Sequence, residues 1–101
     1  MHTVAQAAAA LAGRERILVF TGAGISTESG IPDFRGPNGV WKKVDPKNFT
    51  LRHYVENADF RRERWERWFG KERPEHRPNS AHRAVADLWV TGRMIGCITQ
   101  N

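Results

Sequence analysis

The residues with the clearest chemical potential lie in the segment 17–35, where a short apolar run precedes glycines, hydroxyls and charged side chains. Residues 22–24 read Gly-Ala-Gly, a spacing that lets the backbone turn sharply and approach a ligand closely. We predict that Ser26 or Thr27 caps a helix here, because the free N–H groups of a helix start attract anions. The pattern is typical of phosphate binding. The alternative is a tight turn without a ligand, since Thr27 replaces the third glycine of the dinucleotide-binding fingerprint.

The segment 30–41 is a second place where chemistry is expected. It contains three glycines and two prolines around one acidic, one basic and two aromatic side chains. This composition is too polar for a core and predicts a functional loop. Ordinary structural roles are also open: Asp33 can cap a turn, and Arg35 can pair with Asp33 or with Glu28.

Two apolar runs, at 17–20 and 94–99, predict strands that are covered on both faces. Three helices are predicted: one at 4–12 that Gly13 caps, one at 59–69 that Asn57 or Asp59 caps, and one from Asn79 or Ser80 to Gly92. A short helical turn is predicted at 49–54 and a charged linker at 71–78. A helical crossover between two strands makes them parallel, so both end at the same edge of the sheet. We therefore expect the segments 22–24 and 100–101 to face one crevice, as in α/β folds that bind ligands.

The predicted helix at 59–69 carries Trp65, Trp68 and Phe69 on one face. Such a stripe predicts packing, while stacking on single-stranded nucleic acid is the alternative. The net charge of +5 fits that alternative, but acidic and basic residues alternate in 61–67, which indicates a solvated helix face. We expect no specific nucleic-acid partner.

The single cysteine, Cys97, lies in an apolar run and is predicted to be a small core residue of a cytosolic protein. One cysteine and four scattered histidines do not form a structural zinc site, which needs paired ligands at short spacing. The sequence shows neither a signal peptide nor an apolar run of membrane-spanning length. A cytoplasmic protein without a membrane partner is therefore predicted.

Four motifs then follow one another along the chain: GAGIS at 22–26, GIPDFR at 30–35, PNSAH at 78–82 and TQN at 99–101. In this order they resemble the sirtuin family of NAD-dependent protein deacylases, and RGPNGVW at 35–41 is similar to one branch of that family. The resemblance implies an α/β fold, the N-terminal part of a Rossmann-like doubly wound parallel sheet. Residues 1–101 would form a partial NAD-binding domain.

The resemblance also implies a reaction and its residues. In sirtuins the acyl oxygen of a modified lysine attacks the carbon of NAD that bears nicotinamide, and a histidine base promotes acyl transfer to the ribose. The implied cofactor-binding residues are Gly22, Ala23, Gly24 and Ser26 at the pyrophosphate, Asp33, Phe34 and Arg35 in the cofactor loop, and Gln100 and Asn101 at the nicotinamide ribose. Phe34 would shield the reacting carbon from water, and Arg35 would hold the loop around NAD. His82 is expected to be structural because it lies at a predicted helix start.

The family's catalytic histidine, its zinc ligands and the second half of its NAD-binding domain follow the TQN motif. We therefore expect an N-terminal fragment that has no catalytic base and is inactive alone, with zinc only in a full-length form. The expected partners are NAD and an acylated-lysine protein substrate. Mono-ADP-ribosyl transfer from the same pocket, a basic Trp-rich nucleic-acid-binding module and a non-catalytic interaction fragment are the alternatives.

Overall fold

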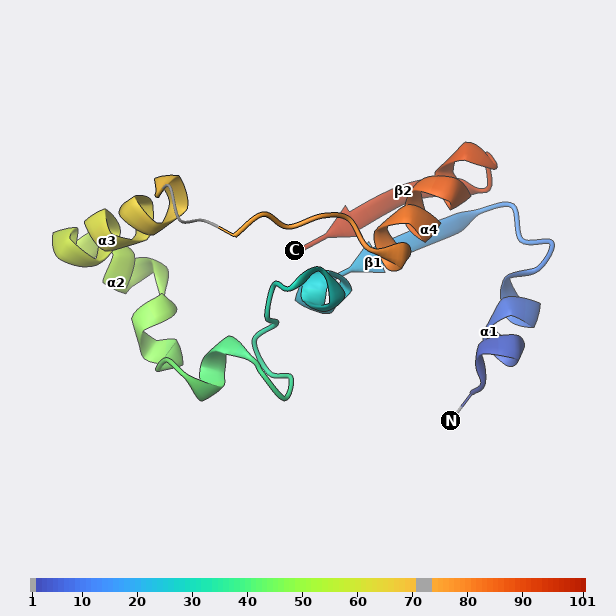
Figure 1. The fold of residues 1–101 in the computed structure, drawn as a ribbon. Coiled ribbons are helices and arrows are strands. Elements are labelled where there is room, and N and C mark those ends of the chain that lie inside the picture. The colour runs from blue at the N-terminus through green and yellow to red at the C-terminus, as the bar shows by residue number, and fades with distance from the viewer. Residues whose placement is uncertain (1, 71–73) are drawn as a thin grey trace.

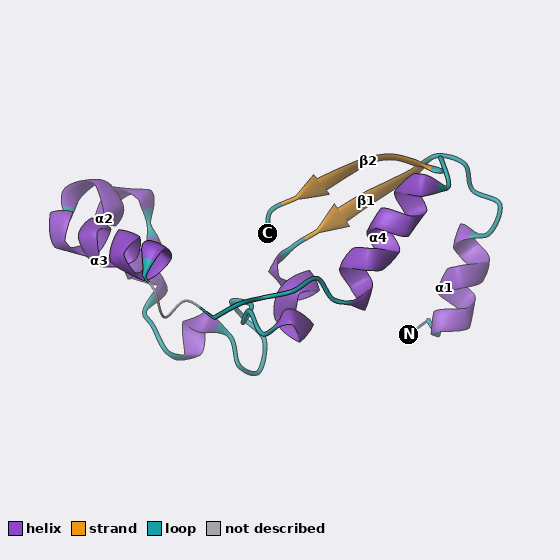
Figure 2. Ribbon diagram, turned by 45° about the horizontal axis from the view of Figure 1, so that its top comes forward, coloured by secondary structure: helices purple, strands orange, loops and turns teal. Residues whose placement is uncertain are grey.

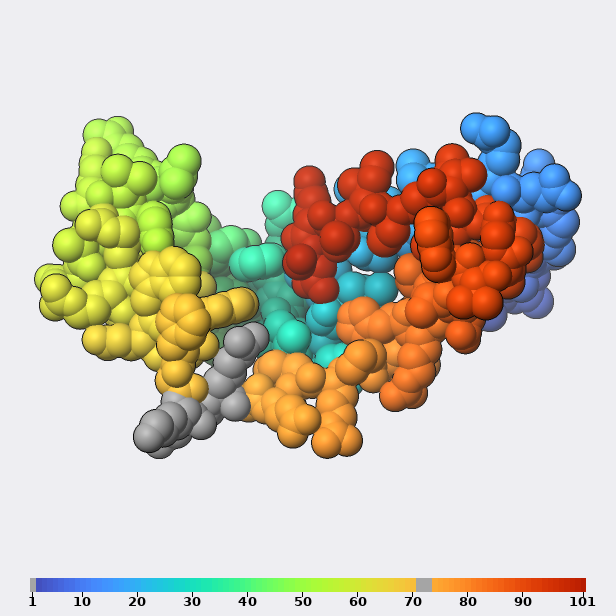
Figure 3. Space-filling view, turned by 90° about the horizontal axis from the view of Figure 1, so that it is seen from above, coloured from blue at the N-terminus to red at the C-terminus, as the bar shows by residue number. Residues whose placement is uncertain are grey.

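The computed structural model describes residues 2–70 and 74–101 and arranges them in two packed parts (Figure 1). One part contains the strands β1 (Ile17–Thr21) and β2 (Met94–Thr99) with the helices α1 (Val4–Leu11) and α4 (Ser80–Val90), and the other contains α2 (Leu51–Glu56) and α3 (Ala58–Phe69). The radius of gyration is 17.7 Å, whereas a compact chain of this length has about 13 Å. The fold is therefore extended, as the space-filling view also shows (Figure 3).

The strand part confirms the predicted parallel pair. β1 and β2 run side by side in the same direction, with Val19 opposite Cys97 (Figure 2). α4 precedes β2 and packs against it, so a helical crossover connects the two strands. The hydroxyl of Thr21 donates to that of Thr99 at 2.8 Å, and the backbone N–H of Gln100 donates to the carbonyl of Thr21 at 3.1 Å. These bonds hold the two carboxyl ends together at one edge of the sheet.

The expectation that both faces of the strands are covered is wrong for the described residues. Leu18, Phe20 and Ile98 are all about half exposed or more, with Phe20 at 66%. Cys97 is also exposed rather than part of a core, because it borders a cavity of about 180 Å³ beside Val85 of α4. A single helix against a two-stranded sheet does not enclose these side chains.

The helix boundaries follow their capping residues. Asn57 accepts from the backbone N–H of Phe60 at 2.9 Å, so it is the cap of α3, which begins one residue before the predicted start. Asn79 caps α4 in the same way. α1 ends at Leu11 with Ala12 as its cap, one residue before the predicted cap, and Gly13 follows with the left-handed φ of 73° that is typical of a glycine after a helix.

The predicted helical turn at 49–54 is present with shifted bounds. It corresponds to α2, which begins at Leu51, and the short 3₁₀ helix η3 (Pro46–Phe49) precedes it. The hydroxyl of Thr50 accepts from the backbone N–H of His53 at 3.1 Å and starts α2 at that point. The predicted linker at 71–78 lies partly outside the described residues, and residues 74–78 have no regular structure.

α3 carries its aromatic stripe toward solvent. Trp65 and Phe69 stack with ring centroids 5.5 Å apart, yet both are more than half exposed, as is Trp68. The packing of this stripe includes the stack along the helix and a contact with α2, where the Trp65 indole donates to the Tyr54 hydroxyl at 3.0 Å. The predicted ion pair between Glu63 and Arg67 is present at 2.7 Å. Among the described helices, none has the length and apolar character to cross a membrane.

Candidate functional site

An open crevice of about 460 Å³ lies where the carboxyl ends of β1 and β2 meet the loop that follows them. Its lining residues are Gly22, Ala23, Asp33, Phe34, Arg35, Trp41 and Gln100. The expectation that the glycine turn and the segment after β2 face one crevice is thus confirmed for Gly22, Ala23 and Gln100. Gly24, Ser26 and Asn101 do not line it.

The turn after β1 leads into a 3₁₀ helix, η1 (Ala23–Ser29), and its cap residue is Gly22. No side chain caps this helix, so the predicted cap at Ser26 or Thr27 is wrong. Both residues lie inside η1: the Thr27 hydroxyl donates back to the carbonyl of Gly24 at 3.0 Å, and Ser26 is buried against α4. The start of η1 therefore has no side-chain cap, and it lies beside the crevice.

Neither the backbone conformation at position 22 nor the packing of the described residues around it requires glycine. Its backbone is extended, with φ of −128° and ψ of −165°, a conformation open to any residue. A Cβ atom built at this position would meet no heavy atom within 4 Å. Neither backbone strain nor packing within the described residues excludes a side chain, so the open space beside Gly22 belongs to the crevice. This geometry favours a ligand-binding turn over an empty one.

The loop over 33–41 closes on itself through its backbone. Val40 donates to the carbonyl of Asp33 at 2.8 Å, and Trp41 donates to the carbonyl of Phe34 at 3.1 Å. A Cβ atom at Gly39 would overlap the carbonyl oxygen of Phe34, so the return of the chain requires glycine there. The loop is held in shape by its own hydrogen bonds.

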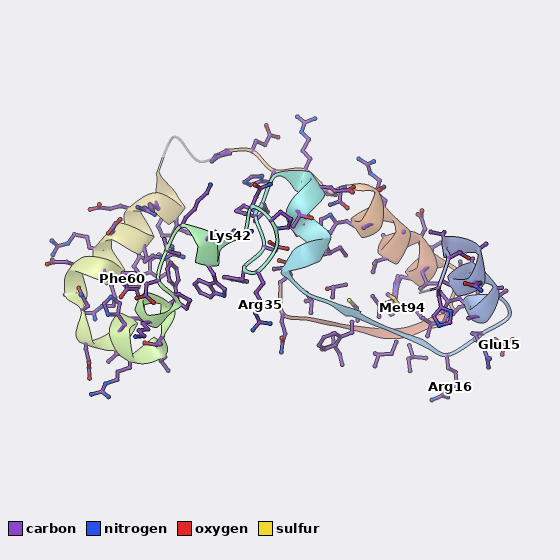
Figure 4. All side chains as sticks on the ribbon, turned by 90° about the horizontal axis from the view of Figure 1, so that it is seen from below. Glu15, Arg16, Arg35, Lys42, Phe60 and Met94 are labelled. Carbon is purple, nitrogen blue, oxygen red and sulfur yellow. The ribbon has the colours of Figure 1, made fainter. Side chains whose placement is uncertain are left out.

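The two charged residues of this loop have different surroundings. The carboxylate of Asp33 accepts from the backbone N–H of Gly36 at 2.9 Å, which confirms a turn-capping role. Within residues 2–70 and 74–101, Arg35 makes no ion pair with Asp33 or Glu28. Figure 4 shows its side chain extending from the loop beside the ends of the strands. Arg35 therefore brings a positive charge without an ion-pair partner among the described residues to a crevice wall that Asp33 also lines.

Ser26 lies behind the crevice, with only 4% of its surface exposed. Its Oγ accepts from the side-chain amide of Asn101 at 2.5 Å and lies 3.3 Å from Nε2 of His82. Nδ1 of His82 accepts from the backbone N–H of Asn79 at 3.0 Å, so the ring proton of the neutral imidazole is on Nε2 and is donated to Ser26. With both lone pairs engaged, the Ser26 hydroxyl is left to act as a donor.

Asn79 joins α4 to η1. Besides capping α4, its side-chain amide donates to the carbonyl of Ile25 at 2.7 Å and to the hydroxyl of Ser29 at 3.1 Å. His82 completes the capping box, in agreement with a structural role for this histidine. The sequence predicts the capping role of Asn79 but not its hydrogen bonds to η1.

Trp41 is the crevice residue that the sequence interpretation did not select. The sequence shows it only as an aromatic residue of the loop over 30–41. The signal that could have identified it is the spacing of Gly36 and Gly39, which predicts a turn that returns the chain toward Asp33 and Phe34. Such a return places Trp41 beside Phe34.

A sequence model described as the Sir2 family matches residues 22–101. The chain belongs to the Sir2 family. Its Sir2 relatives include an NAD-dependent protein deacetylase of Rhodopseudomonas palustris, 46% identical over 93 residues, which cover 90% of this chain and 36% of the relative. NAD-dependent protein deacetylase 1 of Pyrobaculum aerophilum is 44% identical over 86 residues, which cover 83% of this chain and 33% of the relative.

Solved Sir2 structures share the fold. A Sir2 variant with a deacetylated p53 peptide and 3′-O-acetyl ADP-ribose has a TM-score of 0.80 and 34% identity, covering 99% of this chain and 40% of that one. A complex of a Sir2 homologue mutant with ADP-ribose has a TM-score of 0.75 and 33% identity, covering 90% and 36% of the two chains. The chain thus spans about a third of the length of the relatives it matches, and it has part of their Rossmann-like α/β fold.

Proposed function

We propose that residues 1–101 form a partial NAD-binding domain, the N-terminal part of an NAD-dependent protein lysine deacylase. The observation that carries the proposal is the open space beside Gly22, in a crevice that also contains two aromatic rings and Arg35, which makes no ion pair within the described residues. Because the described residues leave room for a side chain at Gly22, the glycine there fits a ligand that comes close to the backbone. The deacetylase relatives and the ADP-ribose complex support NAD as that ligand.

The residues of the crevice fit the chemical groups of NAD. Gly22 and Ala23 offer backbone N–H groups at the uncapped start of η1, which suit the oxygen atoms of a pyrophosphate. Arg35 adds a positive charge on the same wall. Phe34 and Trp41 provide an apolar side, and the Gln100 amide can bind ribose hydroxyls without adding charge.

Ser26, Gly24 and Asn101 are assigned to the layer behind this wall. The Ser26 hydroxyl is buried and does not line the crevice, and Asn101 and His82 hold it in place. Gly24 leaves room beside η1, because a Cβ atom built there also meets nothing within 4 Å. These residues would position the crevice wall.

Bound NAD would supply an electrophilic ribose carbon to which the acyl oxygen of a modified lysine can add. The task of this chain is then to keep water from that carbon and to hold the cofactor in one orientation. Phe34 suits the first task because its ring is 45% exposed and lines the crevice. Asp33 supports it by fixing the loop through Gly36.

We assign no general base to this chain. His82 has both ring nitrogens engaged within the protein, one with Asn79 and one with Ser26. A base must reach the proton that it removes. The proposed deacylation therefore needs a base, and the zinc ligands of the family, from the two thirds of the relatives that this chain does not match.

The test is a chimera in which residues 1–101 replace the matching segment of the Rhodopseudomonas palustris deacetylase. We expect it to bind NAD and to release nicotinamide as it removes acetyl groups from a lysine peptide. A chimera that melts cooperatively but neither binds NAD nor deacetylates the peptide would contradict the proposal. Transfer of labelled ADP-ribose to protein, without loss of acetyl groups, would favour mono-ADP-ribosyl transfer instead.

A further inference from the structure

The aromatic side chains between the crevice and α3 form a continuous series of ring contacts. Phe34 lies 5.0 Å from Trp41, Trp41 lies 5.4 Å from Phe49, and Phe49 lies 5.9 Å from Phe60, all measured between ring centroids. We call these four residues the ring chain. It connects the exposed ring at the crevice with the helical part of the molecule, where Figure 4 shows Phe60.

Burial along the ring chain changes from one end to the other. Phe34 is exposed, whereas Trp41, Phe49 and Phe60 are all half-buried. The far end is also fixed from both sides, because the His53 ring contacts Phe60 at 4.6 Å. The most exposed end of the series is therefore Phe34, at the crevice.

Phe49 occupies the central position of the series. Its ring meets Trp41 and Phe60 edge-on, and the guanidinium carbon of Arg64, on α3, lies 5.1 Å from the ring centroid. Edge-on aromatic contacts and a cation over a ring face are favourable and directional. Phe49 thus ties Trp41 to α3 although it precedes α2 in the chain.

We propose that Trp41 is a positioning residue that holds Phe34 over the crevice, and that α3 fixes Trp41 through Phe49. Trp41 is joined to Phe34 twice, by a backbone hydrogen bond of 3.1 Å and by the ring contact. Trp41 also lines the crevice itself. The catalytic consequence rests on the proposed function, because Phe34 matters as a water shield only if NAD reacts there.

The experiment compares four variants of the chimera. Trp41→Leu removes the ring next to Phe34, and Trp41→Phe restores an aromatic ring. Phe49→Leu interrupts the ring chain at its centre, and Phe69→Leu is its matched control, because Phe69 is 74% exposed and outside the ring chain. Thermal melts of all four show whether a change reflects loss of the fold.

The first measurement is the ratio of nicotinamide released to lysine deacetylated. Entry of water consumes NAD without deacetylation, so a displaced Phe34 raises this ratio. An aromatic pair changes an equilibrium by about 2- to 12-fold, and we expect a rise in that range for Trp41→Leu and Phe49→Leu. Phe69→Leu should keep the ratio of the parent, and Trp41→Phe should give a smaller rise than Trp41→Leu. An unchanged ratio in Trp41→Leu, or an equal rise in Phe69→Leu, would overturn the proposal.

The second measurement does not depend on catalysis. Nuclear Overhauser contacts between the ring protons of Phe34 and Trp41 should be present in the parent and weakened in Phe49→Leu, but not in Phe69→Leu. If the parent lacks deacetylase activity, the proposed function fails, and these contacts alone decide the positioning role. Their absence in a folded parent, or their persistence in Phe49→Leu, would show that α3 does not position the loop.

Discussion

Replacing Gly22 with alanine separates a ligand-binding turn from an empty turn, because the two predict different results. A Cβ atom at this position meets no protein atom within 4 Å, and the extended backbone of Gly22 suits alanine. The substitution should therefore leave the fold intact. Its methyl group would project into space that we assign to the pyrophosphate of NAD.

The expected effects on stability and on binding have opposite signs. Where the native backbone accepts alanine, Gly→Ala stabilises a protein by about 0.4–1 kcal/mol, because the unfolded chain loses conformational freedom. A hydrogen bond from a backbone N–H to a charged group contributes about 1.5–3 kcal/mol. If the methyl group prevents one such bond at Gly22 or Ala23, the affinity for NAD falls roughly 10- to 150-fold.

The assay is calorimetric titration of the chimera and its Gly22→Ala variant with NAD and with ADP-ribose, beside thermal melts. We expect weaker binding of both ligands and a melting temperature that is unchanged or about 1–4 °C higher. Gly39→Ala is the matched control, because its Cβ would overlap the carbonyl of Phe34 and should lower the melting temperature. Unchanged affinity in Gly22→Ala with a normal melt would refute the assignment of this space to the cofactor.

Three further predictions concern single features of the molecule. Arg35→Ala in the chimera should lower kcat/KM for NAD by roughly 10- to 150-fold. The melting temperature should not change, because Arg35 is exposed and makes no ion pair within the described residues. An unaltered kcat/KM would show that Arg35 does not contact the cofactor. His82→Ala should lower the free energy of unfolding by about 1–3 kcal/mol, because the hydrogen bonds to Ser26 and Asn79 are lost, and the pH–rate profile should keep its shape. Loss of the acidic limb of that profile with a normal melt would show that His82 is a base. Residues 1–101 alone should melt without cooperativity and show no deacetylation, because Phe20 and its apolar neighbours are exposed; a cooperative melt with NAD-dependent deacetylation would contradict this.

The order and type of the main elements could be predicted because their signals are local. The caps Asn57 and Asn79 lie directly before α3 and α4, and the apolar runs that predict β1 and β2 are short and continuous. Burial could not be predicted in the same way. Cys97 lies in an apolar strand whose sequence is typical of a core, but its exposure depends on whether other elements cover the cavity beside it.

The site shows the same limit at the level of single side chains. A serine after a glycine turn either caps the helix or turns inward, and the local sequence allows both. In this chain Ser26 turns inward because Nε2 of His82, 56 positions away in the sequence, lies within hydrogen-bonding distance of its hydroxyl. The backbone N–H of Asn79 holds the His82 ring in that orientation. The glycine turn is free of that constraint, because a Cβ atom built at Gly22 meets no heavy atom of the described residues within 4 Å. The cofactor proposal therefore depends on the room that the protein leaves open there, and this room became visible only when β1, η1 and the loop over 33–41 were placed together.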